Sequence, residues 1–229
     1  MAKRRLTKEE LEQDPLIDTF EKVESFYESN KQSIIISAVA LLLIIGGGLG
    51  YYYYSQSQER QAQQLMGYAE NYFLQGDYQN ALTGSEEDFT VGFEQIINNY
   101  SGTDAANLAR YYAAVCEYNL GNTEAALQYM QSYEVPEGIM GVGPLSFHGV
   151  LLTELGRHEE AAEMYVTAAE WDQNDSTTPY NYLEAANAWH DASNIEMARQ
   201  YAEIIVNEYP DSPQEPQAER LLGLIAAVQ

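Results

Sequence analysis

Near its start the chain has a long uncharged run, bracketed by Lys31 and Glu59, which limits the folds that are open to it. The apolar part of the run extends from Ile34 to Tyr54, and 21 residues of helix are about 31 Å long, the hydrocarbon thickness of a bilayer. The run ends in four tyrosines, whose amphipathic rings suit the headgroup region. It therefore predicts one transmembrane helix over residues 32–55.

A cleaved secretory signal is the competing interpretation of this run. About thirty residues precede the apolar part and no small-x-small cleavage site follows it, so we interpret the run as an uncleaved anchor. Gly46 and Gly50 have the spacing that lets two membrane helices approach closely, which would allow self-association. Simple tolerance of glycine in a membrane helix accounts for the same two residues.

The basic residues predict the orientation of this anchor. Six lysines and arginines precede the run, whereas only Arg60 lies close behind it. The positive-inside rule then predicts a cytoplasmic tail over residues 1–31, with a short amphipathic helix that begins near Asp14-Pro15. In a bacterial cell, the chain would be a single-pass inner-membrane protein with its remaining residues in the periplasm.

A turn followed by the start of a helix recurs four times beyond residue 56. The turns begin at Gly76, Gly121, Gly156 and Ser193. Each is followed five residues later by an alanine: Ala81, Ala126, Ala161 and Ala198. The alanines are 45, 35 and 37 residues apart, and two of these spacings are close to the period of tetratricopeptide repeats, about 34 residues. Glycine permits the positive φ of such a turn, and alanine lets the two helices pack closely.

This pattern predicts an all-α fold in which the transmembrane helix precedes a tetratricopeptide-repeat solenoid of about four helical hairpins over residues 56–229. A helix from about Gln214 to Val228 is expected to cap the last hairpin. The acidic stretch TGSEEDFTVG interrupts the first repeat and is expected to form a loop between or within helices. Other helical-hairpin repeats are the alternative fold.

The charge beyond the apolar run is strongly negative. Residues 59–229 contain five arginines, no lysine and 27 acidic residues, a net charge of −22. Such a field repels nucleic acid and anionic lipid, so we expect neither as a partner. A solvated surface suited to a salty habitat explains this acidity most simply, and recognition of a basic ligand is the other explanation. The single cysteine, Cys116, excludes an intramolecular disulfide and is expected to be buried.

No pattern of catalytic, cofactor-binding or metal-binding residues is found in the sequence, so we predict no catalytic residue, no cofactor, no metal and no enzymatic activity. His148, His158 and His190 lack the spacing of metal ligands. The side chains of His190 and Asp191 are expected to point about 100° apart on a helix rather than to converge.

The predicted function is therefore binding of other proteins. In the repeat register, the first helices of the hairpins would present a tyrosine-rich groove formed by Phe73, Tyr111, Tyr118, Tyr180, Asn187 and His190. Packing between neighbouring repeats is the alternative role for each of them. A groove that clamps a peptide carboxylate needs several lysines or arginines. This groove is instead expected to take apolar or mildly basic segments.

The repeat region contains the motifs QGDYQNAL, LGNTEAALQYM and EIIVNEYPDSP. Together with an N-terminal span and an interrupted first repeat, these motifs resemble the tetratricopeptide-repeat proteins of the YfgM type. These are ancillary subunits of the bacterial Sec translocon. The resemblance implies a scaffold in the bacterial inner membrane that links translocon subunits to periplasmic chaperones or exported chains, without catalytic residues. A structural or assembly subunit of another envelope complex, for outer-membrane assembly or secretion, is the alternative. The lysine-free, acidic domain departs from a typical member of this family.

Overall fold

The computed structural model describes residues 15–227, and every regular element in this part of the chain is a helix. The structure divides into two compact units, Met1–Ser57 and Gln58–Gln229. Residues 1–14 of the predicted tail and Val228 of the predicted capping helix lie outside the described residues.

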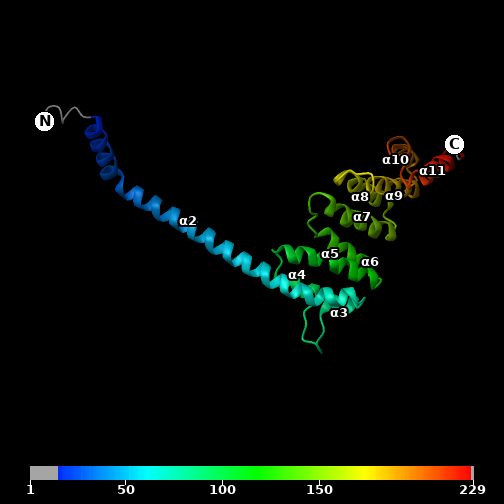
Figure 1. Cartoon of the computed structure of the whole chain (residues 1–229), viewed down its shortest axis with the longest axis horizontal. Coiled ribbons are helices and arrows are strands. Elements are labelled where there is room, and N and C mark those ends of the chain that lie inside the picture. The colour runs from blue at the N-terminus through cyan, green and yellow to red at the C-terminus, as the bar shows by residue number, and fades with distance from the viewer. Residues whose placement is uncertain (1–14, 228–229) are drawn as a thin grey trace, which may run out of the picture. The chain divides into compact units, whose positions relative to one another are not determined.

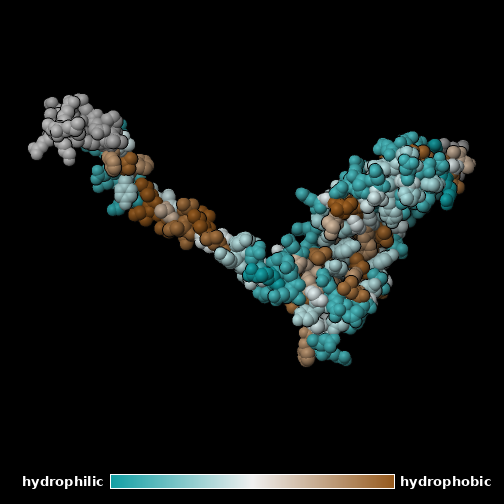
Figure 2. Space-filling model, in the orientation of Figure 1, coloured by the Kyte–Doolittle hydropathy of each residue, from teal (hydrophilic) through white to brown (hydrophobic). Residues whose placement is uncertain are grey.

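The first unit consists of the N-terminal part of helix α2 (Pro15–Leu74), which continues into the second unit. The predicted amphipathic and transmembrane segments both belong to this one helix. From Thr19 onward the helix is long and apolar enough to cross a membrane. Its most apolar window has a mean hydropathy of 2.3 and none of it is buried, unlike the core helix of a soluble protein. Figure 2 shows this stretch as a continuous hydrophobic surface.

The second unit is a row of helical hairpins. The end of α2 is followed by α3 (Tyr78–Thr83) and α4 (Phe93–Asn99). Three further hairpins are α5 (Asp104–Asn119) with α6 (Thr123–Gln131), α7 (Ile139–Glu154) with α8 (His158–Trp171), and α9 (Thr178–Asp191) with α10 (Ile195–Glu208). A last helix, α11 (Glu215–Ala227), packs on α10, where the sequence predicts a cap. Figure 1 shows these hairpins succeeding one another along the domain.

The same turn closes the first helix of every hairpin. At Gly121 (φ 85°), the N–H donates to the Tyr118 carbonyl at 3.0 Å, and the N–H of Asn122 donates to the Glu117 carbonyl at 2.8 Å. This pair of bonds defines the Schellman motif, which satisfies carbonyls at the end of a helix. The same pair recurs at Gly76, Gly156 and Ser193. Ser193 adopts φ 63° without the conformational freedom of glycine.

The alanine that follows each turn is completely buried. Ala81, Ala126, Ala161 and Ala198 are each 0% exposed, as expected of alanines at the contact between two helices. Two clusters of buried apolar side chains form the core of the domain. One joins the end of α2 to α5, and the other extends from α5 to α11. Tyr129 of α6 packs against both clusters.

The first hairpin differs from the other three. Its second helix is broken into α3 and α4, and both pieces pack on α5. The acidic stretch between them forms a loop, as the sequence predicts, and this insertion accounts for the long first spacing between the alanines.

Replacing Ala126 by leucine is expected to destabilise the domain by about 1–3 kcal/mol, because the added atoms would overpack a contact without free space. Thermal unfolding followed by circular dichroism measures this change. Ala125→Leu, at a partly exposed position of the same helix, is the matched control. Equal melting temperatures for Ala126→Leu and the unchanged protein would contradict the assigned packing.

Candidate functional site

An open pocket of about 530 Å³ lies between α5 and the beginning of α7. Its walls combine aromatic, aliphatic and proline side chains from α5, from the α6–α7 connection and from α7. The lining residues are Asp104, Asn107, Leu108, Tyr111, Tyr112, Tyr133, Pro136, Met140 and Pro144. We call this cavity the α5–α7 pocket. Its size and mainly apolar lining are typical of ligand sites.

Aromatic rings that contact one another lie at the α5–α7 pocket. The Tyr111 ring lies 5.8 Å from the Tyr133 ring and 6.1 Å from the edge-on ring of Phe147, measured between centroids. The neighbouring Tyr112 stacks on Phe93 at 5.2 Å and so ties the pocket to the first core cluster. Because each ring is held by others, the pocket presents a fixed aromatic surface.

Two side chains fix the connection that forms one wall. The Asn107 amide of α5 donates to the Glu134 carbonyl at 2.8 Å, and the Asn107 side-chain oxygen accepts from the Glu134 N–H at 2.9 Å. From α8, the Trp171 indole N–H donates to the Pro136 carbonyl at 3.0 Å. Gly141 lies beneath this indole, and a Cβ there would overlap both the ring and the Pro136 carbonyl. The wall is therefore preorganised.

Exposed apolar side chains stand at the mouth of the pocket. Met140 is 73% exposed and Leu108 is 41% exposed. Asp104 is the one charged residue in the lining. The N–H groups of Asp104 and Ala105 are occupied by the Glu59 carboxylate at 2.8 and 3.2 Å. An apolar segment that covers the mouth would remove Met140 and Leu108 from water.

The pocket tyrosines remain neutral at physiological pH. Burial raises the pKa of Tyr111, and the neighbouring Tyr112 adds to this rise. Burial likewise raises the pKa of Tyr133, with a smaller effect from Tyr111. Each hydroxyl can therefore donate or accept a hydrogen bond, and neither supplies a charge for catalysis.

Of the predicted groove residues, Tyr111 lines the pocket and Tyr118 lies two turns farther along α5. The Tyr118 ring meets Phe147 edge-on at 5.6 Å, so Phe147 connects Tyr111 with Tyr118. Phe147 is not among the residues that the sequence predicts for the groove. Its signal is its position on the first helix of a hairpin, but an apolar residue in a helix predicts packing equally well.

Tyr180, Asn187 and His190 are exposed on α9, away from the pocket lining. The half-buried Glu184 lies between Tyr180 and Asn187 on the same face of this helix, and burial raises the pKa of its carboxyl. The expectation that His190 and Asp191 would not converge is wrong. The His190 Nδ1 lies 3.6 Å from an Asp191 carboxylate oxygen, because both flexible side chains lean toward each other in solvent.

Phe73 packs in the first core cluster. Its ring makes edge-on contacts with Tyr78, Phe93 and Tyr112, with centroids 5.7, 6.4 and 4.9 Å away. These contacts correspond to the packing role, so Phe73 is not included in the α5–α7 pocket.

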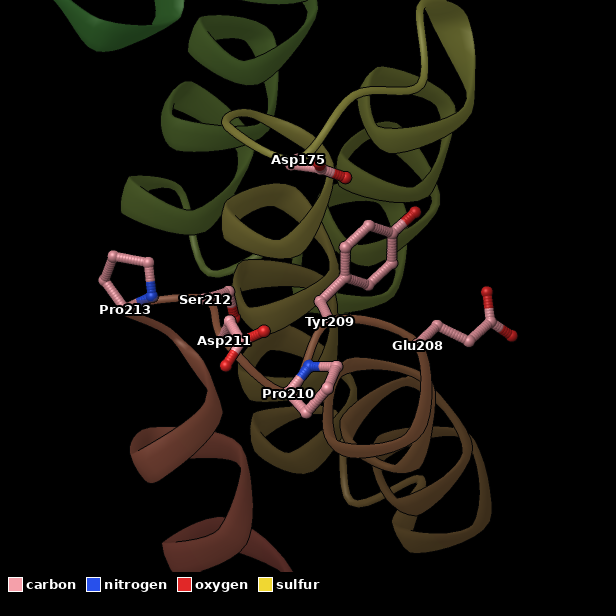
Figure 3. A pocket seen from close by; sticks show the side chains of 7 residues that line it. All are labelled: Asp175, Glu208, Tyr209, Pro210, Asp211, Ser212 and Pro213. Carbon is pink, nitrogen blue, oxygen red and sulfur yellow. The ribbon is translucent and has the colours of Figure 1, made fainter.

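A smaller pocket of about 220 Å³ lies at the connection between α10 and α11. It is lined by Asp175 and by the residues from Glu208 to Pro213, and three of the lining residues are acidic. Figure 3 shows that these three carboxylates lie on different sides of the Tyr209 ring and do not converge. Within residues 15–227, no group of three or more histidine, cysteine or acidic side chains has the arrangement of a metal site.

The chain matches a known protein family. The sequence profile of the family described as a tetratricopeptide repeat-like domain matches residues 24–161, more than half of the chain. No curated protein matches the chain.

Removing the Asn107 side-chain amide should loosen the wall of the α5–α7 pocket. Asn107→Ala loses two hydrogen bonds to the connection, and we expect the free energy of unfolding to fall by about 1–2 kcal/mol. Urea unfolding measures this fall. Asn119→Ala is the control, because the Asn119 amide bonds only within its own helix. Equal losses in both variants would show that Asn107 does not hold the wall.

Proposed function

The chain belongs to the tetratricopeptide repeat-like domain family, and on this basis we propose that it is a membrane-anchored scaffold that holds a segment of another protein in the α5–α7 pocket. Repeat domains of this kind generally mediate binding to other proteins and are typically non-catalytic. The observation that carries the proposal is a preorganised aromatic pocket whose mouth exposes Met140 and Leu108.

The shape of the α5–α7 pocket favours a bulky apolar side chain of the partner. The aromatic base is already ordered, so a ligand would not have to immobilise these rings on binding. The open mouth leaves room for the chain on either side of the inserted side chain. A short extended or helical segment with one aromatic or aliphatic anchor fits these requirements.

The charge of the domain favours basic residues beside that anchor. Asp104 lines the pocket, and the exposed Glu134 and Glu137 lie on the connection that forms its wall. Arg110 is the arginine nearest in sequence to these acidic residues, and its guanidinium donates a hydrogen bond to the Ser101 carbonyl at 3.3 Å. With a net charge of −22 beyond residue 58, the domain attracts a basic segment and repels an acidic one.

We further propose that the apolar part of α2 spans a membrane with its N-terminus in the cytoplasm and the repeats outside. The length and hydropathy of the helix and the excess of basic residues ahead of it support this arrangement. The anchor would confine the binding domain to one membrane surface and so raise its effective concentration for partners there.

The bacterial envelope beside the Sec translocon is the setting that we propose for this scaffold. The support is the resemblance to the YfgM-type proteins in the order of anchor, interrupted repeat and further repeats, and in the motifs LGNTEAALQYM and EIIVNEYPDSP. Translocon subunits, periplasmic chaperones and emerging exported chains would be the partners.

A peptide that alternates arginine with bulky apolar residues should bind the full chain in nanodiscs of zwitterionic lipid, and binding should weaken as salt increases. Leu108→Ala combined with Met140→Ala should weaken binding about tenfold or more, because both side chains lose apolar contact area. Fluorescence anisotropy measures the affinity.

Leu224→Ala is the matched control, because Leu224 is an exposed leucine on α11, outside the pocket lining. A peptide with glutamate in place of arginine should bind more weakly. Tighter binding of the glutamate peptide, or the same loss of affinity in the control variant, would refute the assignment of the pocket.

The orientation is tested with alkaline phosphatase, which is active only outside the cytoplasm. Fusion after Gln229 should give an active enzyme, and fusion ahead of Met1 should not, because the basic residues retain the N-terminus inside. The reverse pattern of activity would show that the orientation is wrong.

A further inference from the structure

The loop between α3 and α4 is tied closed at its base. Gly84 and Gly92 lie so close together that a Cβ on Gly92 would overlap the Gly84 nitrogen and the Leu82 carbonyl. Above them, the Thr90 N–H donates to the Ser85 carbonyl at 3.0 Å, and the Ser85 N–H donates to the Thr90 hydroxyl at 3.1 Å. Figure 1 shows this loop projecting from the helices of the repeat domain.

Side-chain bonds also fix the tip of the loop. The Asp88 N–H donates to the Ser85 hydroxyl at 3.3 Å, and the Tyr72 hydroxyl of α2 donates to the Asp88 carboxylate. The tip is therefore held in one orientation relative to the repeat helices of its own unit.

Phe89 stands at this tip and is 94% exposed. Its backbone adopts φ 53°, a left-handed conformation that is unfavourable for an aromatic residue. Because the ring is exposed, it contributes almost no free energy of burial to the folding of this chain. Burial within the chain therefore offsets neither the cost of its contact with water nor that of its backbone conformation. Phe89 thus disfavours folding through its exposed ring and through its backbone conformation, although the loop holds it in place. Such a residue indicates a contact with a molecule outside the chain.

The surroundings of Phe89 define the chemistry of that contact. Glu86, Glu87 and Asp88 precede the ring, and among residues 15–227 no ion pair neutralises them. Beside Phe89 is an open hollow of about 560 Å³, lined also by Thr83, Ser85 and Gln95. The tip thus presents an aromatic knob, a recess and three carboxylates, which together fit a protein surface with an apolar socket and a basic rim.

Two other occupants are disfavoured by charge. An anionic membrane would repel three consecutive carboxylates beside the inserting ring. A second copy of this chain would offer a repeat domain without lysine and with a net charge of −22, so acidic surfaces would face each other.

We propose that the loop Gly84–Gly92 is a docking element whose Phe89 inserts into an apolar socket rimmed by lysine or arginine on another protein. This contact is distinct from the α5–α7 pocket: the pocket receives a side chain from a partner, whereas the loop supplies one. Failure of either interaction leaves the other intact.

The test uses a photoreactive phenylalanine analogue, p-benzoylphenylalanine, at position 89 of the full chain in the membranes of cells that produce it. Irradiation should crosslink position 89 to one protein, and the mapped peptide should contain apolar residues flanked by lysine or arginine. The crosslink should diminish at high salt and in a variant that combines Glu86→Gln with Glu87→Gln. The same analogue at Leu74, which is 83% exposed on α2, is the control and should not give this product.

Phe89→Asn separates docking from folding, because asparagine tolerates left-handed backbone. Its melting temperature should equal or exceed that of the unchanged protein, whereas affinity for a synthetic copy of the crosslinked peptide should fall on the order of thirtyfold, as for loss of a central aromatic anchor. A lower melting temperature would assign Phe89 to folding and overturn the proposal. Crosslinks only to lipid, only to a second copy, or equally from both positions would also overturn it, as would the absence of any crosslink.

Discussion

The repeat domain depends on a single backbone constraint, a residue with positive φ at the end of the first helix of each hairpin. Four such residues reverse the chain through the same pair of hydrogen bonds, and the alanine five residues later sets how closely the returning helix approaches. A larger side chain at the alanine would separate the two helices and leave the next hairpin without a matching surface. Because each hairpin is stable only when it packs on its neighbours, an error in one turn weakens that hairpin and its contacts with the hairpins on either side.

This constraint explains which parts of the fold are predictable from the sequence. Turn residues and alanines act over a few neighbouring positions, so their pattern identifies the hairpins, and even Ser193 is found through the alanine that follows it. The apolar run is also recognisable from neighbouring residues alone, because its length suits a bilayer. The interrupted first hairpin is recognisable for the same reason, since an acidic stretch replaces the expected apolar positions of a helix.

The α5–α7 pocket is not predictable in this way, because contacts between distant residues form it. Tyr111 was predicted to lie in a groove, but the wall beside it depends on Trp171 of α8 reaching the carbonyl of Pro136. Phe73 and Phe147 both occur on first helices of hairpins. The first packs among Tyr78, Phe93 and Tyr112, whereas the second joins the rings of Tyr111 and Tyr118. Helical periodicity fixes the face on which a ring lies, but it does not reveal whether a neighbouring repeat covers that face.

Ion pairs contribute little to the folding of the domain, and most of its negative charge is therefore free to select partners. Among the described residues, Arg157 forms an ion pair with Glu160 and the His190 imidazole lies near the Asp191 carboxylate, and all four side chains are substantially exposed. Pairs of this kind stabilise a fold weakly, so the core rests on buried alanines and aromatic contacts. Acidic residues lie beside both proposed contacts, namely Asp104, Glu134 and Glu137 at the α5–α7 pocket and Glu86, Glu87 and Asp88 beside Phe89, and the domain contains no lysine. Repulsion of acidic sequences then adds to the attraction of basic ones, and specificity arises from both effects.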